Sequence, residues 1–288
     1  MKMNKIFIEE LIKKYNLESL DISDAPRDLI IMLLSDIKSC KISDIKLNLV
    51  DITEEDVAVL EEMLENISKR KIPPQYLTNK VYIYNECYYV DKSVLIPRQD
   101  TETLIEESIK KITENNYKTM LDLCTGSGVV GISVSCNSEI EKVTLLDISS
   151  DALKIANKNI KLNNSKKCST IESNMFDTLY KSNNKYDIIV SNPPYLTDTE
   201  MKDISEFVKK EPSIALYGGK SGLDYYSKIY DEARKFLNDG GVILVEIGCN
   251  QKKEVLNIIN KYKEYIDVSV VKDINSKDRV IICHFQKQ

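Results

Sequence analysis

The sequence predicts an α/β protein with a mostly parallel sheet and a small helical domain before it. In residues 1–75 apolar side chains recur at helical spacing, and from about residue 119 short runs of Ile, Leu and Val alternate with helical segments. The second rhythm is typical of a parallel sheet covered by helices on both faces. Between the two regions, aromatic and β-branched side chains favour a β-hairpin. We therefore expect a helical domain over 1–75, a β-hairpin linker over 76–98 and an α/β domain over 99–288.

The clearest helix of the first region begins after Thr53. Thr53 and Asp56 have the spacing of a capping box, in which each side chain accepts a hydrogen bond from the other residue's backbone. We expect Pro73–Pro74 to stop this helix, because proline lacks a donor and restricts the residue before it. Three apolar stripes are interpreted as the core of a helical bundle: Phe7, Leu11, Ile12, Tyr15; Leu29, Ile30, Leu33, Leu34; and Val57, Leu60, Met63, Leu64, Ile67.

The linker and the strands are predicted from composition. Two runs of strand-forming residues flank the polar pair Asn85–Glu86, where we place the hairpin turn. We expect Asp100 or Thr101 to cap a helix that runs to about residue 115. Ligands of parallel sheets bind beyond the carboxyl ends of the strands. The predicted strands are Met120–Leu123, Val143–Asp147, Ser169–Ile171, Tyr186–Val190, Val242–Glu246, Val268–Val271 and Val280–Cys283.

Composition disfavours several kinds of function. The net charge of −5 and the pI near 5.3 argue against a broad nucleic-acid surface, which needs clustered cations. The 7 cysteines include no Cys-x-x-Cys pair, and the one histidine, His284, lies in an apolar run, so we expect neither a metal site nor a catalytic triad. No apolar run approaches the roughly 20 residues that span a bilayer. We expect a cytoplasmic protein with no membrane partner.

A glycine-rich loop follows the first strand of the predicted sheet. Gly126, Gly128 and Gly131 have the spacing of a dinucleotide-binding loop, and Asp147 ends the next strand about 20 residues further on. A carboxylate at that position accepts hydrogen bonds from both hydroxyls of a ribose. The two features together indicate an adenosine-type ligand. A tight strand-to-helix turn with a surface aspartate is the alternative interpretation.

Two further positions favour S-adenosylmethionine over NAD as this ligand. Asp122 precedes the loop, where a negative group attracts the ammonium and sulfonium of S-adenosylmethionine and repels a pyrophosphate. Asn174 and Met175 follow the third strand, where the amide can bond the edge of an adenine and the thioether can pack on its face. A core position for Met175 is the alternative interpretation.

The stiff segment Asn192-Pro193-Pro194-Tyr195 follows the fourth strand. Its prolines supply no N–H donors, so the local carbonyls stay available to an incoming group. A substrate –NH2 offers one hydrogen to the Asn192 side-chain oxygen and one to the Pro193 carbonyl, while Tyr195 stacks on the plane that carries the nitrogen. This arrangement raises the electron density on a planar amide or amine nitrogen and aims its lone pair at a methyl group, with no strong base required. The alternative is that the prolines merely end a strand.

Together these motifs resemble the release-factor glutamine methyltransferases over most of the chain. The resemblance implies a class I S-adenosylmethionine-dependent methyltransferase domain, Rossmann-like in its sheet, after a helical substrate-recognition domain over 1–75. It also implies methylation of N5 of the glutamine in the Gly-Gly-Gln loop of class 1 peptide chain release factors. The segments that carry it are Leu95–Arg98 through Thr101–Glu102, Asp122–Gly128, Asn192–Tyr195, Glu211–Pro212, Ala215–Leu216, Gly218–Gly219, Gly222–Leu223, Glu246–Gly248 with Gln251, and Asp278–Val280.

The resemblance assigns roles by position, with Asn192, Pro193 and Tyr195 as the catalytic residues. Asn192 would lie between the cofactor and the substrate, and Pro193, Pro194 and Tyr195 would grip the glutamine. The chain departs from the family at Cys124, where glycine is common, at Asn174, where aspartate is frequent, and at Met175, where some members have a bulkier aromatic residue. The implied cofactor contacts are Cys124, Thr125, Gly126, Ser127, Gly128, Asp147, Met175 and Asn192.

Other functions stay open on the sequence alone. The loop at Asn192 is shared with adenine-N6 DNA methyltransferases and some RNA enzymes, so adenine in DNA, guanine in RNA or a glutamine of a ribosomal protein are alternative acceptors. The small helical region and the acidic charge disfavour the DNA enzymes, which usually carry a target-recognition domain. A nicotinamide-binding oxidoreductase is supported only by the glycine spacing and Asp147. A non-catalytic adapter would bind release factor or the ribosome, but the intact loops argue against it.

Overall fold

The computed structural model describes residues 5–22, 25–182 and 184–288. Its chain separates into two compact units. The helical unit comprises Met1–Asn79 and Ile204–Lys210, and the sheet unit comprises Lys80–Asp203 and Glu211–Gln288. The short segment Ile204–Lys210 belongs to the helical unit because Phe207 is buried in its core. No feature of the sequence pointed to that assignment.

The helical unit packs short amphipathic helices around an apolar core. The predicted capping box is confirmed: Thr53 Oγ1 accepts from the Asp56 amide at 3.1 Å, and the Asp56 carboxylate accepts from the Thr53 amide at 2.8 Å. The proline pair does not itself end this helix, which stops at Arg70 because Lys71 adopts a left-handed conformation; Pro74 begins the next helix instead. The described helices are α1 (Lys5–Lys14), α2 (Pro26–Ile37), α3 (Ile42–Lys46), α4 (Glu54–Arg70) and α5 (Pro74–Thr78).

The sheet unit begins with the predicted hairpin, formed by β1 (Lys80–Ile83) and β2 (Glu86–Tyr89). The turn lies one residue earlier than expected, at Tyr84 and Asn85, because Glu86 pairs with Ile83 as the first residue of β2. Tyr84 accordingly has a positive φ of 58°.

A seven-stranded sheet forms the centre of this unit, in the order β5-β4-β3-β6-β7-β9-β8. Neighbouring strands from β5 to β7 run parallel, whereas β9 is antiparallel to both β7 and β8. The predicted mostly parallel α/β sheet is therefore confirmed. The strands are β3 (Thr119–Leu123), β4 (Lys142–Asp147), β5 (Cys168–Glu172), β6 (Tyr186–Ser191), β7 (Leu237–Glu246), β8 (Tyr265–Lys272) and β9 (Asp278–Phe285).

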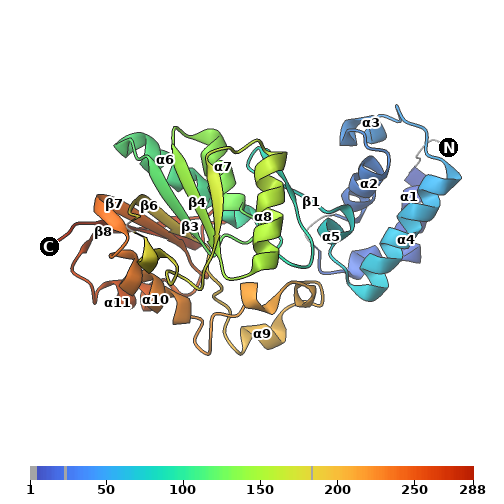
Figure 1. Cartoon of the computed structure of the whole chain (residues 1–288). Helices are drawn as coiled ribbons and strands as arrows, with labels where there is room; N and C mark the ends of the chain where they lie inside the picture. Colours follow the sequence, from blue (N-terminus) through green and yellow to red (C-terminus); the bar gives the residue numbers. More distant parts are fainter. Residues whose placement is uncertain (1–4, 23–24, 183) are drawn as a thin grey trace. The chain divides into compact units, whose positions relative to one another are not determined.

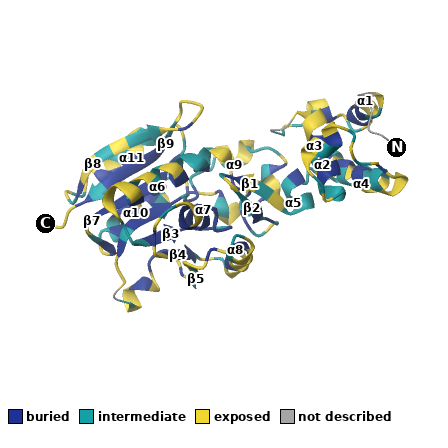
Figure 2. Ribbon diagram, turned by 90° about the horizontal axis from the view of Figure 1, so that it is seen from above, coloured by how far each residue is buried: buried dark blue, intermediate teal, exposed yellow. Residues whose placement is uncertain are grey.

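Helices cover both faces of this sheet, with α6, α7 and α8 on one face and α10 and α11 on the other (Figure 1). Successive residues of a strand point to opposite faces, so Met120 and Leu121 belong to different core clusters. Figure 2 shows the strands largely buried between helices that expose only their outer sides. The helices are α6 (Glu102–Asn115), α7 (Val129–Asn137), α8 (Ser150–Leu162), α9 (Glu200–Asp203), α10 (Asp224–Ala233) and α11 (Lys252–Ile259). In the described residues, no helix has the length and apolar character needed to cross a membrane.

The strand order places a switch point between β3 and β6. The chain moves from β3 outward through β4 to β5, then returns to the other side of β3 as β6. Loops that leave β3 and β6 therefore diverge at the carboxyl edge of the sheet, where open α/β folds bind their ligands. Both the glycine loop and the Asn192 loop leave the sheet at this edge.

Candidate active site

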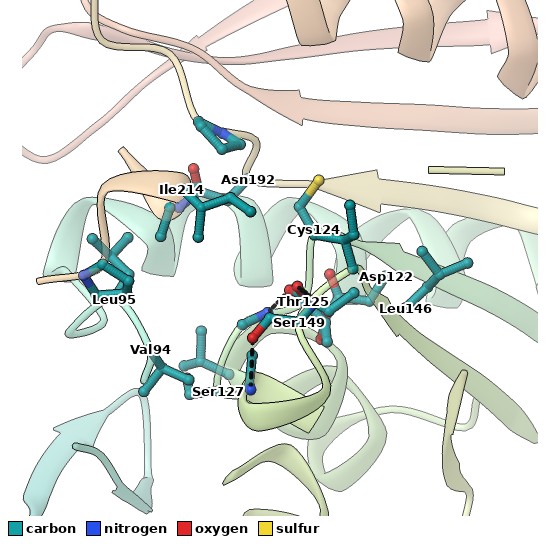
Figure 3. Close-up of a pocket in the computed structure, with 18 of the residues that line it drawn as sticks. Val94, Leu95, Asp122, Cys124, Thr125, Ser127, Leu146, Ser149, Asn192 and Ile214 are labelled. Carbon is teal, nitrogen blue, oxygen red and sulfur yellow. Dashed lines mark hydrogen bonds between the residues drawn. The ribbon is translucent and has the colours of Figure 1, made fainter. Parts of the chain in front are cut away.

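A pocket with a cavity volume of about 110 Å³, partly open to solvent, lies at the carboxyl ends of β3, β4 and β6. Figure 3 shows Val94 and Leu95 on one side of it and Asp122 and Leu146 on the other, with Asn192 near its rim. The expected cofactor residues that line it are Cys124, Thr125, Gly126, Ser127, Asp147, Met175 and Asn192. Gly128, Pro193 and Tyr195 do not line it, and Pro194 does.

The glycine loop turns sharply between β3 and α7. Gly126 has a φ of 55°, and a Cβ at this position would meet no atom within 4 Å, so the backbone there is open to a ligand. The Gly126 amide donates to Asp147 Oδ2 at 2.8 Å. Cys124 also has a positive φ of 61°, which explains why glycine is the easier residue at this position.

Asp122 lies beneath the loop and is only 1% exposed. Its Oδ2 accepts hydrogen bonds from Thr125 Oγ1 at 2.6 Å and from the Gly131 amide at 2.9 Å, so the carboxylate braces both ends of the turn. Burial raises the pKa of Asp122 to about 7, against the opposing effect of these two bonds. The sequence indicated a negative group here, but not its bracing role or its readiness to hold a proton.

Asp147 ends β4 with its carboxylate at the pocket wall. Its Oδ2 accepts from the Gly126 amide and its Oδ1 accepts from the Ser149 amide at 2.9 Å. Burial raises the pKa of this carboxyl, and the backbone donors oppose the shift. Each oxygen keeps a further lone pair, so the group can accept from the two hydroxyls of a ribose while its position stays fixed.

The two interpretations of Met175 are compatible in the structure. Met175 is 4% exposed and packs in the core beside Phe176, yet it also lines the pocket. Its sulfur lies 4.0 Å from Cys124 Sγ. Asn174 is exposed at the pocket rim, where its amide can reach a base edge. Burial raises the pKa of the Cys124 thiol, which keeps it in the neutral form.

The Asn192 loop presents acceptors that have no donor in the described part of the chain. Asn192 Nδ2 donates to Thr101 Oγ1 at 3.2 Å, which leaves Asn192 Oδ1 and the Pro193 carbonyl without a hydrogen bond from any described residue. Tyr195 is half-buried and packs against the core, and burial raises the pKa of its hydroxyl. Its stacking on a substrate stays a prediction.

Several residues that hold this loop had no role assigned from the sequence. Gln251 Nε2 donates to the Tyr195 carbonyl at 2.9 Å, and Gln251 Oε1 accepts from Tyr226 Oη at 3.1 Å and from the Gly248 amide at 3.0 Å. Gly218 packs so closely that a Cβ there would lie 2.6 Å from Tyr195 Cα. In the sequence, Gln251 and Gly218 stood out only because they lie in the segments that carry the family resemblance.

Thr101 and Asp100 precede α6, but neither side chain caps it as expected. Thr101 Oγ1 instead donates to Glu246 Oε2 at 2.9 Å, and Asp100 forms an ion pair with Arg279 at 2.9 Å. Residues Gln99–Thr101 already form a 3₁₀ turn and Thr101 has helical φ and ψ, so the helical segment begins before the predicted cap. The two side chains connect the start of α6 to the end of β7, at Glu246, and to the start of β9, at Arg279.

The Arg98 and Glu211 segments form one ion-paired brace. Glu211 is 5% exposed; its Oε2 accepts from the Ile96 amide at 2.9 Å and its Oε1 is paired with Arg98. Burial raises the pKa of Glu211, and Arg98 opposes the shift. The brace joins the Leu95 wall of the pocket to the Pro212 wall, although these two segments are far apart in the sequence.

The fold and this pocket together define an S-adenosylmethionine-dependent methyltransferase of class I, and residues 100–221 match the methyltransferase small domain. The release factor glutamine methyltransferase of Clostridium acetobutylicum is 37% identical over 219 residues, which cover 75% of this chain and 76% of that protein. The corresponding enzyme of Clostridium botulinum is 36% identical over 80% of this chain and 84% of its own length. The chain belongs to the release factor glutamine methyltransferase family.

A solved structure shows the same fold. A methyltransferase from Pyrococcus furiosus superposes with a TM-score of 0.50, over 69% of this chain and 89% of that one, at 18% sequence identity. At this identity the likeness concerns the fold alone. The class I methyltransferase fold predicted from the sequence is confirmed.

The raised pKa of Asp122 predicts a specific pH dependence of stability. The folded protein keeps this proton up to about pH 7, whereas the unfolded chain releases it near the ordinary value of 3.8. The stabilisation is therefore complete below that value and is lost as the pH rises through 7. Relative to Asp122→Asn, the ligand-free wild type should lose up to roughly 4 kcal/mol of unfolding free energy between pH 4 and 7.5.

Urea denaturation across this pH range measures the effect. Asp177→Asn, at an exposed aspartate, serves as the matched control and should run parallel to the wild type. Parallel curves for the Asp122→Asn variant and the wild type would show that Asp122 is ionised in the folded protein at all these pH values.

Proposed function

We propose that this protein transfers a methyl group from S-adenosylmethionine to the side-chain amide nitrogen N5 of the glutamine in the Gly-Gly-Gln motif of class 1 peptide chain release factors. The observation that carries the proposal is a pair of acceptors, Asn192 Oδ1 and the Pro193 carbonyl, that no described residue occupies beside a pocket suited to an adenosine ligand. The relatives named above are release factor glutamine methyltransferases, which supports the choice of acceptor protein. We further propose that the helical unit recognises the release factor.

The residues of the pocket fit S-adenosylmethionine. The open backbone at Gly126 admits a ligand, and Asp147 offers two oxygens to a ribose. Asn174 and Met175 supply a polar and an apolar partner for an adenine. Asp122 becomes an anion when a cation approaches, because an opposite charge lowers a carboxyl pKa. When bound, S-adenosylmethionine supplies an electrophilic methyl group on a positively charged sulfur.

The Asn192 loop activates the substrate by orientation. Asn192 Oδ1 and the Pro193 carbonyl each accept one hydrogen of the glutamine –NH2, which raises the electron density on the nitrogen and aims it at the methyl carbon. The nitrogen forms a bond to the methyl carbon while the carbon–sulfur bond breaks and its electron pair stays on sulfur. The nitrogen then releases one proton to water, because the methylated, protonated amide is strongly acidic. No strong base is needed, since positioning supplies most of the rate.

A methyl-transfer assay tests the acceptor. With labelled S-adenosylmethionine, we expect the label to enter class 1 release factor, and replacement of the Gly-Gly-Gln glutamine by alanine should abolish it. Ribosomal protein, DNA and RNA serve as competing acceptors in parallel reactions. Label that appears only in one of these would overturn the proposed substrate.

Asn192→Ala should separate catalysis from cofactor binding. The variant removes one of the two amide acceptors, so kcat should fall on the order of 100-fold. Cofactor affinity should change by less than about threefold, because the glycine loop and Asp147 are untouched. Steady-state kinetics and calorimetry measure the two quantities. A kcat near that of the wild type would contradict the assigned role.

Asp147→Ala should produce the opposite pattern. Loss of two hydrogen bonds to a charged group should weaken S-adenosylmethionine binding on the order of 10- to 100-fold. At saturating cofactor, kcat should be largely retained, since Asp147 lies away from the acceptor loop at the end of β4. Isothermal calorimetry measures the affinity, with Asp177→Asn as the exposed control. Unchanged affinity would remove the ribose assignment.

A further inference from the structure

A chain of hydrogen bonds continues from Asn192 into the protein interior. Asn192 Nδ2 donates to Thr101 Oγ1 at 3.2 Å, and Thr101 Oγ1 donates to Glu246 Oε2 at 2.9 Å. The three residues come from the end of β6, the start of α6 and the end of β7. Thr101 and Glu246 are 1% and 2% exposed, so water does not compete for these bonds.

The direction of this chain follows from the available hydrogens. Burial raises the pKa of Glu246 to about 7, while the bond from Thr101 and the nearby Arg279 oppose this rise. Once ionised, the carboxylate only accepts, so the single hydroxyl hydrogen of Thr101 is committed to Glu246. The Thr101 oxygen can then only accept from its other neighbour, and the group of Asn192 that faces it must be the –NH2. Because a side-chain amide is planar, this leaves Asn192 Oδ1 on the opposite side, free for a substrate hydrogen.

The reverse orientation of the amide is unfavourable for a second reason. The Asn192 amide also lowers the pKa of the Glu246 carboxyl, which is the effect of a donor that faces the carboxylate. A flipped amide would place its oxygen against the carboxylate and the hydroxyl oxygen, with no hydrogen between them. An unpaired buried acceptor of this kind costs about 1–3 kcal/mol.

The surrounding charges keep Glu246 in place. Arg279 is buried nearby and attracts the carboxylate, while Asp100 repels it. Arg279 is itself fixed by Asp273 at 3.0 Å, by Asp100 at 2.9 Å and by the Ile247 carbonyl at 3.2 Å. The acceptor at the end of the chain is therefore part of a rigid ionic network.

We propose that Thr101 and Glu246 are positioning residues that fix the side-chain amide of Asn192 with Oδ1 toward the substrate. The proposal rests on the proposed function of Asn192 in holding the glutamine amide. Without the pair, the amide presents –NH2 to the substrate –NH2 in a large share of the molecules, and two donors then face each other. Thr101 and Glu246 do not touch the substrate amide nitrogen; they act through Asn192.

The test is a double-mutant cycle on the full-length protein with release factor as acceptor. Thr101→Val keeps the shape but removes the hydroxyl, and kcat should fall about 10- to 100-fold. Thr101→Ser should recover most of that loss. In an Asn192→Ala background, Thr101→Val should change kcat by less than about threefold, because its effect passes through the missing amide.

The matched control is Thr113→Val, on the exposed side of the same helix. Calorimetry and thermal unfolding report cofactor affinity and folding for each variant. If Thr101→Val does not fold, Glu246→Gln replaces it in the cycle. A glutamine can donate to Thr101 and so reverse the direction of the hydrogen bonds. We expect kcat to fall roughly tenfold.

The outcomes separate the two proposals. Independent, multiplicative losses in the cycle would show a merely structural role and overturn the inference, as would wild-type turnover in Thr101→Val. Either result leaves release-factor methylation by the wild type intact. Absence of labelling by the wild-type protein would instead overturn the proposed function, and this inference with it.

Discussion

The pairing of β3 with β6 is the constraint on which the site depends. Leu123 and Ser191 are register partners at the carboxyl ends of these parallel strands, and Ser191 Oγ donates to the Leu123 carbonyl at 2.7 Å. The next residues, Cys124 and Asn192, therefore leave the sheet side by side and turn apart at the switch point. A ligand held by one loop is thereby adjacent to a group held by the other, although 68 residues separate them in sequence. A slip of β6 by one residue would reverse every side chain on it and separate the two loops.

Three buried carboxyl groups around this junction accept hydrogen bonds from protein donors. Asp122 braces the glycine turn, Glu211 joins two pocket walls, and Glu246 receives the hydroxyl of Thr101. Burial raises the pKa of each of these carboxyls. Arginines lie beside Glu211 and Glu246, whereas no cation among the described side chains is ion-paired with Asp122. The carboxyl left without a countercharge is thus the one at the wall where we propose that a cationic cofactor binds.

The sequence predicted the elements whose signal is local. Runs such as Ile188–Val190 predicted strands, the Thr53 capping box predicted a helix start, and the glycine spacing predicted a ligand turn. Partners separated by more than 100 residues left no local signal: Thr101 reaches Glu246 across 145 positions and Glu211 reaches Ile96 across 115. The expected side-chain cap at Thr101 was wrong because the chain is already helical from Gln99, so Thr101 lies inside the helical segment. The hairpin turn lies one residue earlier than predicted because Glu86, although polar, pairs with Ile83 as part of the second strand.

The single histidine of the sequence lies away from the Asn192 loop. His284 pairs with Val242 in the antiparallel β7–β9 ladder, whereas Val280 pairs with Glu246, so the histidine lies at the end of β7 opposite to the pocket. In the mechanism that we propose, catalysis on the amide nitrogen comes from alignment, which is only effective if the acceptors do not move. Gln251 and Gly218 fix the backbone of the loop from one side, and Thr101 fixes the Asn192 side chain from the other. A loop held at both its backbone and its side chain would keep two acceptors fixed, and the proposed mechanism requires this property.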